Sequence, residues 1–210
     1  MSTLSMPEAQ AILRSRGIAP ADYKDALFDA SGAGDVELLH LLIAAGVDVN
    51  EPYDEYGYRA VSCACYHGKS ECTQLLMDVG ADINVNDSLG SAILSGCIDL
   101  VKMLIKRGAD VNSQASGVWT PLQCAVHEWE PEMVKILLAA GADTEWGVGN
   151  EDAPLILAVD EANEKMVRIL LEAGANPNIE DDKLGKPLGI ALNRNLHSIA
   201  ELLIQFGARK

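Results

Sequence analysis

The chain has 210 residues, with 31 acidic and 16 basic side chains and a formal net charge of −15 at pH 7. This excess of negative charge argues against binding to nucleic acid, because nothing in the chain neutralises a phosphate backbone. Five cysteines, an odd number at ordinary helix positions, favour reduced thiols and a cytoplasmic protein. The N-terminus has no long apolar core after a basic region, so we expect neither a secretory signal nor a membrane span.

The first predicted helix begins at Ser5-Met6-Pro7-Glu8 and runs to about Arg16, with Gly17 as a stop signal. We expect residues 1–24 to form a capping helix and a connector. Such a segment would cover the apolar edge of the helices that follow.

From residue 25 onward one pattern returns six times. Each copy ends in an amphipathic run closed by a glycine, and successive glycines are 34, 28, 33, 33 and 33 residues apart. In the run 99–107, for example, the apolar residues form a helical stripe with basic residues outside it. A glycine after each run supplies the left-handed residue that ends a helix. The six glycines are Gly46, Gly80, Gly108, Gly141, Gly174 and Gly207.

A shorter helix is predicted in the first half of each copy. Its clearest form is 120–126, where Thr120 caps the helix and Pro121 fits its first turn. A small residue near the end of each short helix allows neighbouring helices to approach closely. These residues are Ala30, Ala64, Ala92, Ala125, Ala158 and Ala191.

The combination of a Thr-Pro-Leu first helix, a Val-Lys-Leu-Leu type second helix and a Gly-Ala-Asp-Val-Asn ending, at about 33 residues, resembles the ankyrin repeat. The resemblance runs from about Asp25 to the C-terminus. It implies an all-α fold, an α-solenoid of about six helix-turn-helix repeats with β-hairpin-like finger loops. Fingers and first helices would build a concave face. The histidine that the family carries after the leucine is absent; Phe28 and Gln123 are among its replacements.

We divide the chain into repeats at about 25–50, 51–84, 85–112, 113–145, 146–178 and 179–210, and expect a single domain. The repeat 85–112 is short because its finger is shortened. The repeat 51–84 has the opposite change, an eight-residue finger.

Aromatic residues gather in the fingers and first helices, away from the aliphatic stripes. Exposed tyrosine and tryptophan dominate interface energetics, so these residues are the candidate partner-binding surface. Acidic residues of the fingers would form its charged rim, while many basic residues fall on second helices. A finger at 180–182 is also acidic. The candidates are Tyr53, Tyr56, Tyr58, Tyr66, Trp119, His127, Trp129 and Trp146, with Glu51, Asp54, Glu55, Glu151 and Asp152 as the rim.

No motif for catalysis, a cofactor or a metal emerges from the sequence. Cys63 and Cys65 are separated by one residue, which is not a redox or zinc spacing. His67 and His127 are two repeats apart and could not share an ion. The expectation is a non-enzyme with no cofactor and no metal.

The sequence therefore predicts a protein-binding module, monomeric by itself, whose acidic fingers attract a basic protein partner and whose aromatic residues anchor it. Acidic fingers that only maintain solubility are the plainer interpretation. One alternative function is an immunity or inhibitor protein that neutralises a basic toxin such as a nuclease. Others are a scaffold bound to an enzyme that it does not inhibit and, from another class, a metal-dependent enzyme using His127 and nearby acids.

Overall fold

The computed structural model describes residues 4–85, 88–114, 119–146 and 153–209. These residues form thirteen α helices and one short 3-10 helix. The chain divides into two compact units, residues 1–110 (unit 1) and residues 111–210 (unit 2). The predicted all-α solenoid of helix pairs is confirmed.

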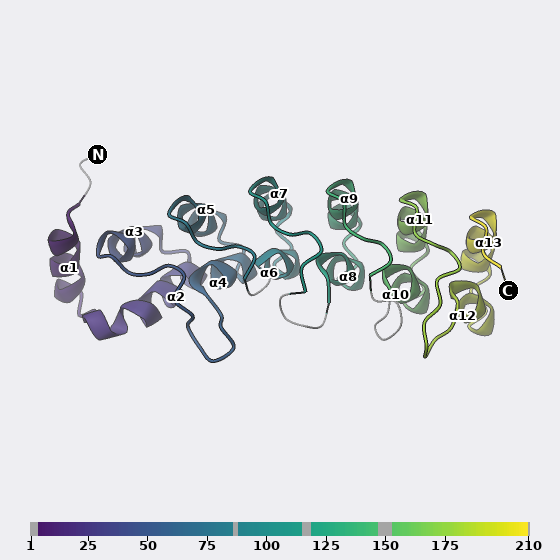
Figure 1. Ribbon diagram of the computed structural model, residues 1–210, viewed down its shortest axis with the longest axis horizontal. Helices are drawn as coiled ribbons and strands as arrows, with labels where there is room; N and C mark the ends of the chain where they lie inside the picture. Colours follow the sequence, from purple (N-terminus) through teal and green to yellow (C-terminus); the bar gives the residue numbers. More distant parts are fainter. Residues whose placement is uncertain (1–3, 86–87, 115–118, 147–152, 210) are drawn as a thin grey trace. The chain divides into compact units, whose positions relative to one another are not determined.

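Unit 1 is built from an N-terminal helix followed by three helix pairs. The first helices of the pairs, α2, α4 and α6, pack side by side in one row, and α1, α3 and α5 pack in a second row (Figure 1). The elements are α1 (Met6–Ser15), η1 (Pro20–Asp22), α2 (Tyr23–Ala33), α3 (Val36–Ala44), α4 (Ala60–Tyr66), α5 (Ser70–Asp78), α6 (Ser88–Leu94) and α7 (Ile98–Lys106).

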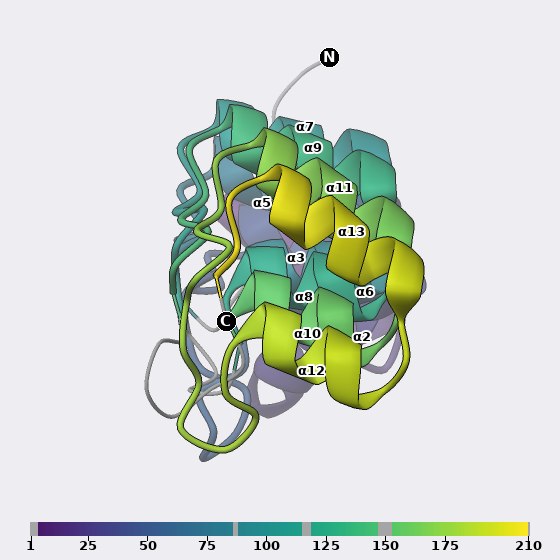
Figure 2. The same ribbon diagram turned by 90° about the vertical axis from the view of Figure 1, so that its right-hand side faces the viewer.

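Unit 2 repeats the same construction with three more pairs. Figure 2 shows α8, α10 and α12 in one layer and α9, α11 and α13 in the other. In each layer the middle helix, α10 or α11, packs against both of its neighbours. The elements are α8 (Pro121–His127), α9 (Pro131–Ala139), α10 (Pro154–Asp160), α11 (Glu164–Glu172), α12 (Pro187–Asn193) and α13 (His197–Gln205). Leucine, isoleucine, valine and alanine fill the space between the layers.

The six repeating glycines end the second helices as predicted. Each has a φ between 88° and 96°, a left-handed conformation in which a side chain would be strained. After each first helix, too, one residue is left-handed. In unit 1 this residue is Gly34, Gly68 or Gly96, and in unit 2 it is Trp129, Ala162 or Asn195.

The asparagine that ends each repeat binds the turn of the following repeat. Asn50 Oδ1 accepts from the Asp82 amide at 2.8 Å, and Asn50 Nδ2 donates to the Gly80 carbonyl at 3.0 Å. Glu145 takes the place of asparagine once, and its carboxylate accepts from the Asn176 amide at 2.9 Å. We call this series the asparagine ladder. Its members are Asn50, Asn84, Asn112, Glu145 and Asn178.

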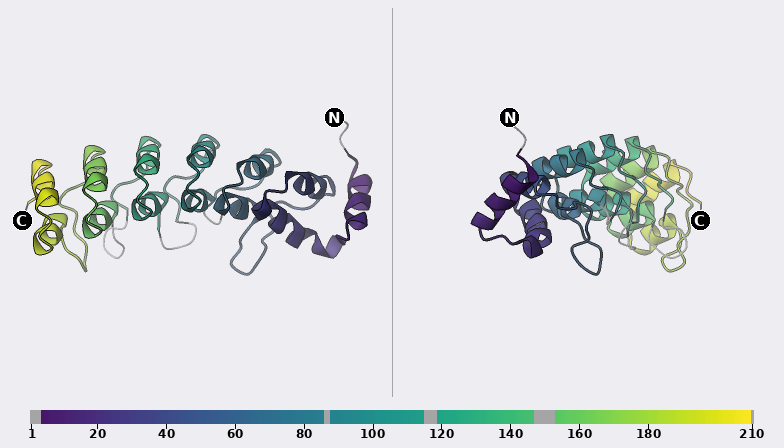
Figure 3. Two further views of the ribbon diagram at one scale, coloured as in Figure 1. Left: turned by 180° about the vertical axis from the view of Figure 1, so that it is seen from behind. Right: turned by 60° about the vertical axis from the view of Figure 1, so that its left-hand side comes forward.

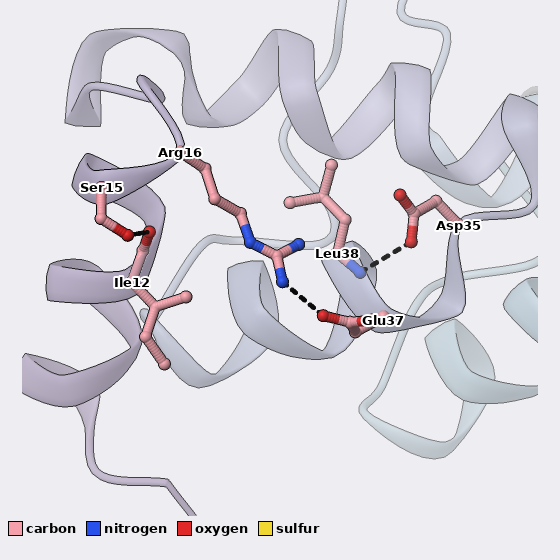
Figure 4. Close-up of polar contacts among 6 residues, drawn as sticks. All are labelled: Ile12, Ser15, Arg16, Asp35, Glu37 and Leu38. Atoms are coloured by element: carbon pink, nitrogen blue, oxygen red, sulfur yellow. Dashed lines mark hydrogen bonds and ion pairs between the residues drawn. The ribbon is translucent and has the colours of Figure 1, made fainter.

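Helix α1 covers α3 at the N-terminal end of unit 1 (Figure 3). Its start is fixed by a capping box in which the Ser5 amide donates to the Glu8 carboxylate at 2.9 Å. Ala9 and Leu13 of α1 are fully buried. Arg16 forms an ion pair with Glu37 of α3 (Figure 4). Apolar burial and one exposed ion pair therefore hold α1 on α3, and the burial contributes more.

Candidate functional site

The finger 51–58 of unit 1, here called the tyrosine finger, is held in one conformation by its own contacts. Asp54 Oδ1 accepts from the amides of Tyr56 and Tyr58, both at 3.1 Å. The Tyr53 amide donates to the Tyr58 carbonyl at 2.6 Å, which closes the loop. The Tyr53 ring stacks on Phe28 of α2, with centroids 3.9 Å apart and planes at 12°. The finger is thus fixed before any partner arrives.

Some of the candidate residues of this finger stabilise its conformation, and others are exposed to solvent. Tyr53 is half-buried, because its ring lies on Phe28, so the expectation that it faces solvent is corrected. Tyr56 is 74% exposed and Tyr58 45% exposed. Glu51 and Glu55 are exposed as well, and Asp54 is exposed although one of its oxygens holds the turn. The display side of the finger is therefore aromatic and acidic.

Tyr66 lies at the end of α4 in the same unit. It is 56% exposed, and its ring meets His67 edge-on at a centroid distance of 5.2 Å. Its position follows from the short first helix, whose other side chains from Val61 to Cys65 turn mostly into the core. Tyr66 is the one member of the set in unit 1 that a helix rather than a finger positions.

Unit 2 contains the other aromatic candidates, here called the tryptophan group: Trp119, His127, Trp129 and Trp146. The rings of Trp119 and His127 contact each other at 4.6 Å with an angle of 63°. His127 Nδ1 lies 3.0 Å from Glu161 Oε1, at the end of the next first helix. Glu161 Oε2 is buried without a hydrogen-bond partner. Trp119 and Glu161 therefore fix the imidazole from two sides.

Trp129 is held in an exposed position by a left-handed turn of the backbone. It is 57% exposed and has φ 57°, directly after the C-cap of α8. The Trp129 amide donates to the Val126 carbonyl at 3.1 Å, and the Glu130 amide donates to Ala125 at 3.1 Å. A left-handed conformation costs an ordinary residue about 1–2 kcal/mol. The turn thus holds a large aromatic side chain outward at an energetic cost.

The remaining candidates of unit 2 include exposed and half-buried residues. Trp146 is 40% exposed, whereas Trp119 is half-buried and is corrected from solvent-facing because it packs on His127. Glu151 and Asp152 lie outside the described residues. In the acidic finger at 180–182, Asp181 is 5% exposed and its Oδ1 accepts from the amides of Lys183 and Leu184. This carboxylate holds a turn and is not available as a rim charge.

Sequence reasoning missed Phe28 and Glu161. Phe28 occupies the place of the family's missing histidine, and an aromatic residue there was a signal for a stacking partner. Glu161 lies 34 residues after His127, one residue beyond the equivalent position in the next repeat, Asp160, so equivalent repeat positions alone do not pair them.

Two features of the described residues concern metal binding and thiol reactivity. Within the described part of the chain, no three His, Cys, Asp or Glu side chains converge as a metal site would require. Burial raises the pKa of the Cys65 thiol to about 12 and that of Cys63 to about 11, so both remain protonated and poorly nucleophilic. None of the helices in the described ranges combines the length and apolar character needed to cross a membrane.

Comparison with known proteins agrees with this architecture. A family model described as ankyrin repeats (3 copies) matches residues 9–87, 27–115 and 89–181. Ankyrin repeat domain-containing protein SAT10 of Stachybotrys chartarum is 33% identical over 99 residues, which cover 45% of this chain and 5% of that protein. Glycerophosphocholine phosphodiesterase gde1 of Schizosaccharomyces pombe is 32% identical over 100 residues, covering 44% of this chain and 9% of that protein.

Among solved structures, an ankyrin repeat domain from Acinetobacter baumannii AYE superposes with a TM-score of 0.77 at 27% identity. The match covers 87% of this chain and 98% of that one. The chain spans only a small part of the two curated relatives described above, so the similarity concerns their repeat regions. The helix pairs, the glycine stops, the asparagine ladder and the matched residues together establish that this chain belongs to the ankyrin repeat family.

Proposed function

We propose that this protein binds a basic protein partner through the tyrosine finger of unit 1 and the tryptophan group of unit 2. Ankyrin repeats are general protein–protein interaction modules. The observation that carries the proposal is the tyrosine finger, in which Tyr56 is 74% exposed on a loop that Asp54 and the Phe28–Tyr53 stack hold in place. A fixed aromatic side chain loses little conformational entropy on binding.

The charge of the partner is inferred from the finger and from the whole chain. Glu51, Asp54 and Glu55 belong to the same finger as the exposed tyrosines, and the chain carries a net charge of −15. Carboxylates beside tyrosine rings favour lysine and arginine through both charge and the face of the ring. Long-range attraction of this kind raises the association rate and weakens as salt is added.

The test is capture of partners from extracts of the native host, with a Tyr56→Ala/Trp129→Ala double variant beside the wild type. The proposal predicts a basic protein that only the wild type retains, with weaker retention at high salt. An Ile204→Ala variant is the matched control, since Ile204 is 56% exposed on α13 and belongs to neither aromatic group. Equal recovery by the double variant would refute the proposal.

An inhibitor of a basic toxin is a second candidate, favoured by the strongly acidic chain. It makes one additional prediction: the recovered partner loses its own activity when bound. Full activity of the bound partner would favour a scaffold. Although one relative is named a phosphodiesterase, the match covers 9% of that protein. The ankyrin fold is typically a non-enzymatic interaction module, and we propose the same for this chain.

A further inference from the structure

The imidazole of the tryptophan group is supported by a carboxylate from the next repeat of unit 2. His127 is the last residue of α8, and Glu161 is the C-cap of α10. The His127 side chain is 48% exposed, whereas that of Glu161 is 17% exposed. A largely shielded carboxylate therefore holds a ring that a partner can reach.

The contact with Glu161 determines which ring nitrogen of His127 carries the proton. A carboxylate only accepts hydrogen bonds, so across the distance of 3.0 Å His127 Nδ1 is the donor and Glu161 Oε1 the acceptor. In a neutral imidazole the other nitrogen, Nε2, then has a lone pair and acts as an acceptor. Nε2 has no hydrogen-bond partner among the residues that the structure describes.

Two contacts keep the ring in this orientation. Rotating the imidazole by half a turn would replace Nδ1 with a carbon and take the donor away from Glu161 Oε1. Glu161 Oε2 is already buried without a partner, so both oxygens of a shielded carboxylate would then be unsatisfied. The ring also packs on Trp119, with centroids 4.6 Å apart at an angle of 63°. The orientation with Nδ1 towards Glu161 is therefore the favoured one.

The residues that follow His127 in the chain favour a cation at this acceptor. Glu128 is exposed, and the next residue, Trp129, exposes its indole. A carboxylate attracts positive charge, and the face of an indole binds ammonium and guanidinium groups. The imidazole nitrogen adds a directed acceptor to these two attractions. A cationic side chain with several N–H donors fits this combination better than an anionic or an apolar one.

We propose that His127 Nε2 accepts a hydrogen bond from an arginine or lysine side chain of the partner, and that Glu161 is the positioning residue that maintains the acceptor tautomer. The opposite tautomer would place an N–H at Nε2, which opposes another donor and favours a carboxylate instead. Glu161 thus selects for basic side chains at this point. The inference rests on the proposed basic partner and adds one specific contact to it.

The first experiment measures the tautomer in the free chain at pH 8 by long-range proton–nitrogen NMR. The chain has four histidines, and the His127 signals are identified by their loss in His127→Phe, which keeps a ring beside Trp119. We expect a protonated Nδ1 and an unprotonated Nε2 in the wild type. A protonated Nε2 would overturn the inference.

Two variants show whether Glu161 sets the tautomer. In Glu161→Gln the amide can either accept from Nδ1 or donate to it, so we expect both tautomers. Glu172→Gln is the matched control, because it removes the same charge from an exposed residue of α11 and should leave the tautomer unchanged. The same single tautomer in Glu161→Gln would overturn the role of Glu161.

The second experiment titrates the whole chain with N-acetyl-arginine-N-methylamide. The matched probe is the norleucine analogue, whose side chain has no N–H donor. We expect the arginine probe to shift the Nε2 signal of His127 and the norleucine probe to leave it in place. The affinity for the arginine probe should fall by about tenfold in His127→Phe and about threefold in Glu161→Gln. Equal shifts with both probes, or unchanged affinity in both variants, would overturn the inference.

The proposed function has a different readout. Neither the tautomer nor probe binding requires the captured partner, and Tyr56→Ala should weaken retention of that partner while leaving the Nε2 response to the arginine probe unchanged. Equal partner recovery by the Tyr56→Ala/Trp129→Ala variant would refute the proposed function. Absence of an Nε2 response in a wild type that does retain a basic partner would overturn the assignment of His127 alone.

Discussion

The two units use the same turn between paired helices but build it from different residues. In unit 1 the left-handed position is Gly34, Gly68 or Gly96, with φ from 64° to 84°. In unit 2 it is Trp129, Ala162 or Asn195, with φ from 57° to 59°. The following amide donates back to the helix in both, as Lys69 does to Ala64 at 2.8 Å and Asn163 does to Ala158 at 3.0 Å.

This difference shows that the packing of the helix pair imposes the turn and that glycine is only its least costly residue. Three turns of unit 2 accept a strain of about 1 kcal/mol each for residues other than glycine. Among the described residues, nothing explains the choice of alanine at 162 or asparagine at 195. At Trp129 the strained position displays an exposed indole, and strained residues often lie at functional sites.

The largest effect is expected from giving a unit 1 turn a branched side chain. Gly96→Val should lower the free energy of unfolding by about 2 kcal/mol, because φ 71° is unfavourable for a β-branched residue. A Cβ at this position meets nothing within 4 Å, so the backbone conformation alone accounts for any loss in Gly96→Ala. Urea denaturation measures it, with Gly96→Ala as a milder control. If neither variant lowered the free energy of unfolding, the claim that this turn favours glycine would be contradicted.

The next largest loss of stability is expected from a substitution in the asparagine ladder, which both units share. Asn112→Ala removes an acceptor for the Asp143 amide at 2.8 Å and a donor to the Gly141 carbonyl at 3.4 Å. We expect a loss of about 1–2 kcal/mol in unfolding free energy.

Glu145, the exception in the ladder, provides the reciprocal test. An ionised glutamate cannot donate to the Gly174 carbonyl, whereas asparagine can. Glu145→Asn should therefore raise the free energy of unfolding by about 0.5–1 kcal/mol. A decrease, measured by urea denaturation beside Asn112→Ala, would contradict this account of the ladder.

A smaller gain is expected from placing glycine in a turn of unit 2. Ala162→Gly should raise the free energy of unfolding by about 0.5 kcal/mol, because relief of the left-handed strain exceeds the entropy that glycine adds to the unfolded chain. Asn195→Gly should gain less, since asparagine tolerates this conformation better. Equal losses in both variants, measured by thermal denaturation, would mean that these turns are not strained.

The cysteines should affect stability only at high pH and not at neutral pH. Burial raises the pKa of Cys65 to about 12 in the folded protein, against 9.0 for an ordinary thiol. Above about pH 9 the unfolded chain therefore ionises at this position while the folded chain does not, so stability falls as the pH rises towards 12. Iodoacetamide at pH 9 should spare Cys65 until urea is added. Rapid alkylation of the folded chain would contradict this burial.

The fold was predictable because its signals recur. Six glycines near a 33-residue period, and the short helices before them, identify the helix pairs without any long-range information. The asparagine that ends most repeats is visible in the sequence, but its bonds to the next repeat were not predicted from it. Those bonds join one repeat to the next and depend on tertiary packing.

The candidate site was predictable only in part. Exposure of Tyr56 and Trp129 follows from their places in a finger and a turn. The support provided by Phe28 to Tyr53, and by Glu161 to His127, depends on which repeats lie side by side. From the sequence alone, Asp54 and Asp181 are both acidic residues of finger loops. Their hydrogen bonds show that each holds a turn, and Asp181 is buried besides.

The most direct test of the binding surface is calorimetry with the captured partner, using Trp129→Gly and, as its matched control, Ala162→Gly. Both variants place glycine at the equivalent left-handed position of two different repeats, so they share the same backbone effect. The account predicts that Trp129→Gly weakens binding by about 2 kcal/mol, roughly thirtyfold in Kd, while Ala162→Gly binds as the wild type does. Wild-type affinity in Trp129→Gly would contradict the claim that this exposed indole anchors the partner.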